Sequence, residues 1–285
     1  MMNNREFKQF LGVNALRLFI AITAIFLIMF LYIIFSKGGK MVTWSFLTES
    51  PRRFMTEGGI FPAIMGTFYL TILSILIALP LGVLTAIYMV SYGKPAWFVK
   101  MVKIAVNTLA GVPSIIYGLF GMTVFVQLFQ MDVSILAGSL TLAILALPVM
   151  INASEEALSS VPHDFREASL ALGATERQTI MKVILPTALP NILTGAIISI
   201  GRVAGETAPI LFTAATFYNR HLPTSVMDEV MVLPYHIYAL MTEGAHADKQ
   251  VPIAYGTAVV LLVLVLLVST VAIIIRYNIR KKRKW

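Results

Sequence analysis

The chain has 285 residues, of which 58% are hydrophobic and only 13% are charged, and its mean hydropathy is +0.83. Soluble globular domains are typically about 25% charged. This composition therefore excludes a wholly water-soluble fold, and lipid must solvate part of the chain. The absence of cysteine excludes disulfides and thiolate metal sites, and the sequence contains no metal-ligating cluster.

Apolar runs long enough to cross a bilayer, or within about one residue of the 20 or so required, occur six times. The first ends in Ser-Lys-Gly-Gly-Lys rather than a small-residue cleavage site, so we interpret it as a retained span and not a signal peptide. The sequence therefore predicts an all-α membrane protein with six transmembrane helices, at Asn14–Phe35, Met65–Val90, Ile104–Phe129, Val133–Ile151, Leu189–Ala214 and Ile253–Ile275.

The distribution of Lys and Arg predicts the orientation in the membrane. With the N-terminus inside, fifteen of the 22 basic residues lie in the inner segments, six lie in the outer segments, and Arg202 lies within a span. Both termini are therefore expected to be cytoplasmic. The net charge of +8 then reflects topology, and the basic tail 277–285 is expected to lie near anionic lipid. We expect no nucleic-acid partner.

The third span contains the sequence Gly-Val-Pro-Ser-Ile-Ile-Tyr-Gly. Small residues allow neighbouring helices to approach closely, and proline bends a helix. We therefore expect a bent, closely packed helix, with Gly111, Pro113 and Gly118 as its packing positions rather than as substrate contacts.

The inner loop at 152–188 has the signals of two short helices. Pro162 suits a first helical turn and Gly173 a helix end. Thr175 and Gln178 fit a capping box that opens a second helix, which Pro186 and Pro190 are expected to break. Such a helix–Gly–helix hairpin could enter a groove of another protein, or lie on the lipid headgroups.

The loop resembles the EAA loop of ABC importer permeases, which has Glu-Ala-Ala, three residues, Gly, nine residues and then Ile-x-Leu-Pro. Ser169 replaces the second Ala and Val183 replaces the Ile. The resemblance implies a type I (MetI-like) permease in which the loop docks into a separate ATP-binding subunit. The residues carried over to this coupling contact are Glu167, Ala168, Ser169, Gly173 and Pro186.

The chain has no G-x-x-x-x-G-K-[ST] phosphate loop, so we expect it to bind no cofactor of its own. Mg-ATP would be bound and hydrolysed by the partner subunit, which would make this chain a transporter component and not an enzyme.

Two opposite charges, Arg202 and Glu206, lie one helical turn apart in the fifth span. Arg202 would lie about 20 Å from the cytoplasmic end of that helix, where an arginine costs about 2.5–3.5 kcal/mol on insertion scales. Gly201 and Gly205 leave room beside the pair, and Pro209 is expected to free a backbone carbonyl near residue 205. The pair is interpreted either as an ion pair that fixes helix packing or as a polar gate on a substrate path, to which we also assign Thr207.

A guanidinium in a span with few other charges favours an anion with several oxygens. Hydrogen phosphate keeps a proton that it could donate to a carboxylate such as Glu206, whereas sulfate has none. The pair could therefore favour phosphate over sulfate.

Three segments are similar to phosphate ABC importer permeases: the sequence from Asn107 to Met122, the sequence from Gly201 to Ala214, and the sequence from Met231 to Leu240. The Gly-Glu-Thr-Ala-Pro segment resembles the PstA type. The resemblance implies that Arg202 and Glu206 act in phosphate passage. It also implies a homologous permease, two ATP-binding subunits and an extracytoplasmic phosphate-binding protein as partners.

The expected organisation is an N-terminal part (1–60) without a motif, a permease core (61–276) and the basic tail (277–285). Three alternatives stay open. The substrate could be another oxyanion, such as molybdate, sulfate or phosphonate. The chain could be a proton-coupled secondary transporter that uses Glu206, or a membrane scaffold that transports nothing.

Overall fold

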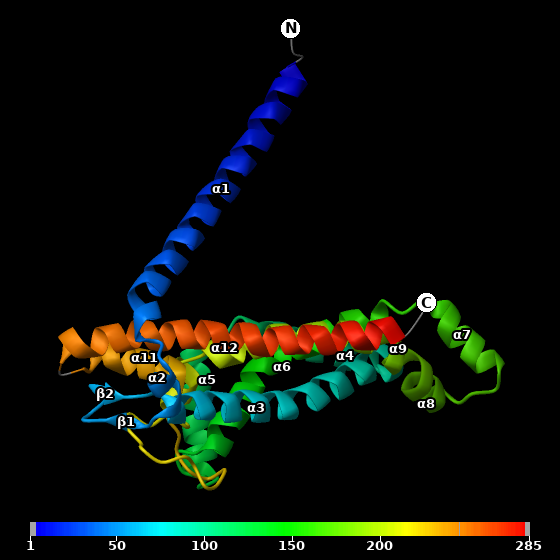
Figure 1. Ribbon diagram of the computed structural model, residues 1–285. Helices are drawn as coiled ribbons and strands as arrows, with labels where there is room; N and C mark the ends of the chain where they lie inside the picture. The colour runs from blue at the N-terminus through cyan, green and yellow to red at the C-terminus, as the bar shows by residue number, and fades with distance from the viewer. Residues whose placement is uncertain (1–3, 245, 283–285) are drawn as a thin grey trace.

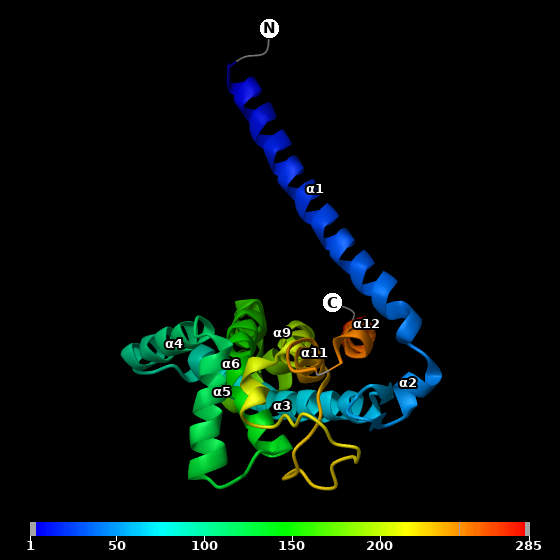
Figure 2. The same cartoon turned by 90° about the vertical axis from the view of Figure 1, so that its left-hand side faces the viewer.

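The structure, a computed structural model, describes residues 4–244 and 246–282. Its centre is a bundle of four long helices: α3 (Phe61–Ile87), α6 (Ile135–Ser159), α9 (Leu185–Gly205) and α12 (Ala247–Lys282). They lie side by side in Figure 1. Helix α1 (Asn4–Gly38) contacts the bundle only near its C-terminal end and then projects away from it (Figures 1 and 2).

The two ends of the bundle differ. The hairpin end carries α7 (His163–Ala171), α8 (Glu176–Thr179) and the C-terminal end of α12 (Figure 1). The opposite cap end carries the 3-10 turn Gly39–Met41, α2 (Trp44–Thr48), the antiparallel strands β1 (Pro51–Arg52) and β2 (Glu57–Gly58), and α11 (Leu233–Thr242). The predicted inner loop and C-terminal helix thus share one end. Arg283, Lys284 and Trp285 of the predicted basic tail lie outside the described residues.

Small residues set the helix spacing in the bundle. Ala78, Ala146 and Ala196 are buried where α3, α6 and α9 meet. A Cβ on Gly82 would meet Met150, and one on Gly195 would meet Ala153. Van der Waals packing between closely spaced helices supplies much of the cohesion of a membrane bundle, because lipid tails are as apolar as the side chains.

The N-terminal sixty residues help to close the cap end, although the sequence offered no motif there. Phe46 and Met55 are buried in one apolar cluster with Leu233, Leu240 and Ile253. The segment around α11 packs against the same end, and most of residues 230–240 are buried within the chain itself.

Five of the described helices are long and apolar enough to cross a membrane, or six if one sharply bent pair counts as a span. That pair replaces the predicted third span. Helix α4 (Ala96–Ala110) and the segment of α5 (Ser114–Gly121) with its π-helical continuation Met122–Leu128 meet at 104°. Gly111 and Pro113 lie in the break, where proline has no N–H and disfavours helix in the residue before it. The phenol of Tyr117 donates to the carbonyl of Leu109 across the bend at 2.6 Å.

Two other predicted boundaries change. Helix α6 continues to Ser159, beyond the predicted end of the fourth span at Ile151. The prediction that Pro186 and Pro190 break the helix before the fifth span is wrong, because α8, a π-helical segment (Ile180–Ile184) and α9 form one 30-residue helix. The π turn shifts the hydrogen-bond register just before Pro186, which then occupies the first turn of α9, where no N–H is required. A third π-helical segment, Tyr88–Tyr92, extends α3.

Candidate functional site

The intramembrane charge pair lies at a break in a helix. Helix α9 ends at Gly205, Glu206 has extended backbone angles (φ −73°, ψ 133°), and the short helix α10 (Ala208–Leu211) follows Thr207. The predicted fifth span through Ala214 is therefore wrong beyond Gly205. Pro209 cannot donate to the carbonyl of Gly205, and glycine favours helix termination. The sequence predicted one free carbonyl within a continuous helix, whereas the helix ends at this point.

The two charges still meet across this break. Arg202 Nε lies 3.5 Å from Glu206 Oε1, and the exposed fractions of the two side chains are 39% and 17%. Arg202 occupies the last turn of α9, where the unpaired carbonyls give the helix end a partial negative charge that attracts a cation. Arg202 thus has two sources of negative potential, and part of its guanidinium remains accessible.

Glu206 lines a small cavity between the break and the helix bundle. The cavity measures about 10 Å³ and also touches Thr67 and Thr71 of α3 and Val203 of α9. A volume of about 10–15 Å³ holds at most one water molecule, so an ion the size of phosphate does not fit in this conformation. The geometry suits a closed gate rather than an enclosed binding pocket.

The break is held by α5. A Cβ on Gly118 would come within 2.8 Å of the carbonyl oxygen of Ala208 and 3.1 Å of the Cα of Pro209. Non-helical backbone at membrane depth is tolerated only where protein or a water-filled cavity satisfies it. By contrast, the nearest atom to a Cβ on Gly201 is 3.9 Å away, and no described atom lies within 4 Å of one on Gly205. A Cβ on Gly111 would meet only the carbonyl oxygen of Thr108, at 3.5 Å.

The predicted coupling residues gather on the hairpin, except one. Glu167 and Ala168 are exposed on α7, and Gly173 has the left-handed φ of +83° that turns the chain between α7 and α8. The predicted capping box of Thr175 and Gln178 is present. Pro186 lies in the membrane helix, away from the hairpin turn.

Two polar contacts brace the hairpin. Arg166 of α7 forms an ion pair with Glu176 of α8 at 2.8 Å, and the Ser169 hydroxyl lies 2.9 Å from that of Thr179, which is buried. The leucine at the turn, Leu172, is 89% exposed. The hairpin therefore presents an apolar tip on a braced base, a form suited to insertion into another protein.

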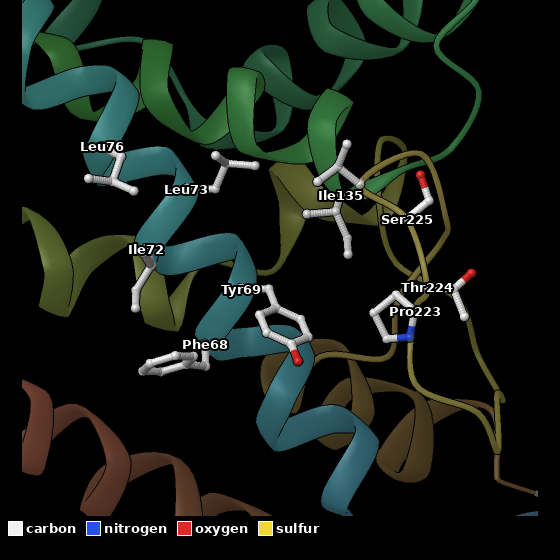
Figure 3. A pocket seen from close by; sticks show the side chains of 10 residues that line it. Phe68, Tyr69, Ile72, Leu73, Leu76, Ile135, Pro223, Thr224 and Ser225 are labelled. Carbon is white, nitrogen blue, oxygen red and sulfur yellow. The ribbon is translucent and has the colours of Figure 1, made fainter.

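A larger hollow at the cap end is unsuited to an anion. It measures about 350 Å³ and lies between α3 and the segment 223–226 (Figure 3). Its wall is mostly apolar and includes Phe68, Leu73 and Ile135, with Pro223 opposite (Figure 3); Thr224 and Ser225 lie at one side. An ion would lose hydration there without gaining charged or converging polar partners.

Sequence reasoning missed two polar contacts between helices. Lys103 of α4 pairs with Glu155 of α6 at 2.6 Å. Arg276 of α12 donates from Nη1 to Thr194 Oγ1 of α9 at 2.9 Å. Both basic residues had been counted only as topology signals. Polar residues near the inner ends of several spans were the available clue.

Comparison with known families gives one match that covers most of the chain. The model described as "binding-protein-dependent transport system inner membrane component" matches residues 78–285. This range includes the hairpin and the Arg202–Glu206 break.

Similar curated proteins match over most of the chain. A probable ABC transporter permease protein, YqgI of Bacillus subtilis, is 34% identical over 94% of this chain and 95% of its own length. The phosphate transport system permease protein PstA 1 of Mycobacterium tuberculosis is 35% identical over 90% of this chain and 84% of its own. A probable phosphate transport system permease protein PstA of Methanocaldococcus jannaschii is 39% identical over 79% of this chain and 78% of its own length.

Solved structures show the same fold at lower identity. A chain of a bacterial alginate ABC transporter gives a TM-score of 0.62 at 20% identity and covers 93% of this chain and 96% of that one. A chain of the MetNI methionine ABC transporter in an inward-facing conformation gives a TM-score of 0.59 at 24% identity. The match covers 78% of this chain and 94% of that one.

Proposed function

Since the chain belongs to the family of inner-membrane components of binding-protein-dependent transport systems and is the permease subunit of an ABC importer, we propose that its substrate is inorganic phosphate. The observation that carries the proposal is the Arg202–Glu206 pair at the break after α9. It offers guanidinium donors for phosphate oxygens and a carboxylate that can accept the proton of hydrogen phosphate. The relatives named as phosphate permeases support the same substrate.

Coupling to ATP would run through the hairpin. Glu167, Ala168 and Ser169 on α7, with Gly173 at the turn, would contact a separate ATP-binding subunit that holds and hydrolyses Mg-ATP. The 30-residue helix from Glu176 to Gly205 joins the base of the hairpin to the last turn before the gate. A displacement of the hairpin would therefore reach Arg202 along one continuous helix.

The remaining partners follow from this assignment. Half of the path would come from a homologous permease facing the accessible side of Arg202, and phosphate would arrive from an extracytoplasmic binding protein at the cap end. We expect the hairpin end of the bundle and both chain termini to be cytoplasmic.

The test is uptake of radiolabelled phosphate by cells that lack this permease and carry wild type, Arg202→Gln or Glu206→Gln. Sulfate and molybdate serve as competitors, and the amount of each variant in the membrane is measured. The matched control is Arg53→Gln, because Arg53 also pairs with a glutamate four residues later, Glu57, but on the exposed cap end. We expect phosphate alone to compete, Arg202→Gln to abolish uptake at normal abundance, and Arg53→Gln to transport normally.

Two results would refute the proposal. Restored uptake that sulfate or molybdate blocks as well as phosphate would assign the permease to another oxyanion. Uptake that persists in Arg202→Gln, or disappears only together with the protein, would make the pair a packing contact.

A further inference from the structure

A second polar feature lies between the gate and the hairpin end. A groove of about 280 Å³ runs between α6 and α9. Its polar lining comes from Glu156, Ser160, Asn191 and Thr194, and its floor includes Ala153 and Gly195. The small floor residues let the two helices approach closely while leaving the groove open above them.

The groove and the gate share one face of α9. Asn191, Thr194, Ile198 and Arg202 follow one another at intervals of three, four and four residues, the spacing of a single helical stripe. At about 1.5 Å per residue, Thr194 lies about 12 Å along the helix from Arg202. An ion released at the gate toward the hairpin end would therefore meet this stripe next.

Beside the stripe lies a guanidinium that has no carboxylate partner among the described residues. Arg276 of α12 donates to the neutral hydroxyl of Thr194 at 2.9 Å and, among the residues that the structure describes, forms no ion pair. Thr194 in turn donates to the carbonyl of Pro190 at 3.2 Å, so its oxygen is free to accept from Arg276. This arrangement holds a cation against α9 at the edge of the groove with donors to spare.

Neutral polar groups continue the same surface. Asn191 lies 3.4 Å from Ser160 across the groove, and Asn152 of α6 lies 3.4 Å from Asn107 of α4, all of them exposed. Amides within spans are expected to face water or another helix rather than lipid. The basic Lys103 nearby is already paired with Glu155.

We propose that this groove is a second oxyanion site, with Arg276 as its cation, that receives hydrogen phosphate from the Arg202 gate on the way to the hairpin end. This inference rests on the proposed function and extends it. Glu156 on the lining adds one negative charge, which hydrogen phosphate can approach by donating its proton. The site is consequently weak, as a release site must be, since conduction requires that an ion leave as readily as it enters.

A phosphate group could also reach Arg276 as a lipid headgroup, so the test separates the two sources. The chain has no cysteine, so single cysteines at Asn191 and Ile198 can be followed on this subunit without background from its other residues. Leu266, 63% exposed on α12, is the control for a lipid-facing position. The complete transporter is reconstituted in vesicles of purely zwitterionic lipid or with added anionic lipid, and labelling by a charged, membrane-impermeant thiol reagent from the hairpin side is timed.

We expect Asn191→Cys and Ile198→Cys to react and Leu266→Cys to stay unlabelled. Phosphate should slow labelling at least several-fold in zwitterionic vesicles, and Arg276→Gln, but not Arg276→Lys, should abolish that protection. Absent labelling at 191 and 198, or protection by anionic lipid instead of phosphate, would overturn the groove assignment. If wild type transports phosphate in a manner that depends on Arg202, but phosphate does not change the labelling rate of the groove cysteines, this inference alone fails. Protection by a different transported oxyanion would refute the phosphate assignment of both sites.

Discussion

Arg202 Nε lies 3.5 Å from Glu206 Oε1, although the helix that carries Arg202 ends at Gly205, between the two residues. The contact therefore depends on the angle between α9 and the extended residue 206 as well as on helical spacing. A small rotation of α9 would separate the charges, whereas an unbroken helix would keep them together. An ion pair across a break can serve as a switch, because the geometry that forms it is not the only one available to the backbone.

Exchanging the two charges separates gating from packing. In the double variant Arg202→Glu/Glu206→Arg the pair can reform, but the guanidinium moves from the last turn of α9 to the extended segment. Hydrogen bonds to charged groups contribute about 1.5–3 kcal/mol, so we expect uptake to fall about ten- to a hundred-fold at normal abundance. The measurement is phosphate uptake per copy of permease in the membrane. Full recovery of uptake by the exchange would show that only the pairing matters.

Closing the break should also stop transport. Gly205→Ala meets no described atom within 4 Å, and alanine favours helix over glycine by about 1 kcal/mol. Combined with Pro209→Ala, which restores a donor to the carbonyl of residue 205, it should join α9 to α10. We expect normal abundance and loss of most uptake. The corresponding control is Gly12→Ala, because Gly12 lies in α1 and has no described atom within 4 Å of an added Cβ. Normal uptake in the double variant would mean that the break itself has no role.

Much of the fold was predictable because a bilayer imposes one rule, namely that apolar stretches of about twenty residues become helices. The capping box of Thr175 and the turn at Gly173 were predictable because their chemistry is local. Proline was the main source of error. The same residue type lies in a sharp break at Pro113, is accommodated after a π turn at Pro186, and at Pro209 removes the donor that would continue the helix past Gly205. These outcomes depend on tertiary neighbours, which no local pattern contains.

The candidate site was predictable in part for a related reason. An arginine and a glutamate in an apolar run attract attention because each is costly there. Arg276 was not singled out from the sequence, because an arginine close to a basic tail is already explained as a topology signal. Its contact with Thr194 joins residues 82 positions apart. Nothing in the spacing of α12 indicates that partner.

The left-handed backbone conformation of Gly173 at the hairpin turn gives a third prediction. Gly173 has φ +83° and no described atom within 4 Å of an added Cβ, so Gly173→Ala adds no clash but costs about 1–2 kcal/mol in the left-handed region. The turn should open and reorient α7. We expect several-fold less ATP-binding subunit to copurify with the tagged permease, with uptake falling in proportion and membrane abundance unchanged.

Gly39→Ala is the control for the turn, since Gly39 also has no described atom within 4 Å of an added Cβ but does not have a positive φ. It should copurify the ATP-binding subunit normally. Unchanged copurification and uptake in Gly173→Ala would argue against docking through the hairpin.

Acid should destabilise the cap end through His236, which lies on α11 and outside the spanning helices. Thr257 donates its hydroxyl proton to the carbonyl of Ile253 at 2.9 Å, and its oxygen lies 3.2 Å from His236 Nδ1. His236 therefore donates from Nδ1 and keeps Nε2 unprotonated. Burial of the ring, which is 2% exposed, lowers the pKa of His236 from 6.5 to about 4, because a second proton would create a charge without water around it.

The lowered pKa determines how the stability of the folded protein changes with pH. Unfolded chains take up the proton near pH 6.5 and the folded protein only near 4, so the stabilisation is complete above pH 6.5 and declines as the pH falls toward 4. The loss is on the order of 3 kcal/mol. Thermal unfolding midpoints of the detergent-purified permease, measured across this range, should fall less steeply with acid in His236→Gln than in wild type. The glutamine retains an amide donor for Thr257 but does not titrate, while every other acidic and basic group is the same in both proteins. Parallel pH profiles for the two proteins would therefore show that His236 is not held neutral by the fold.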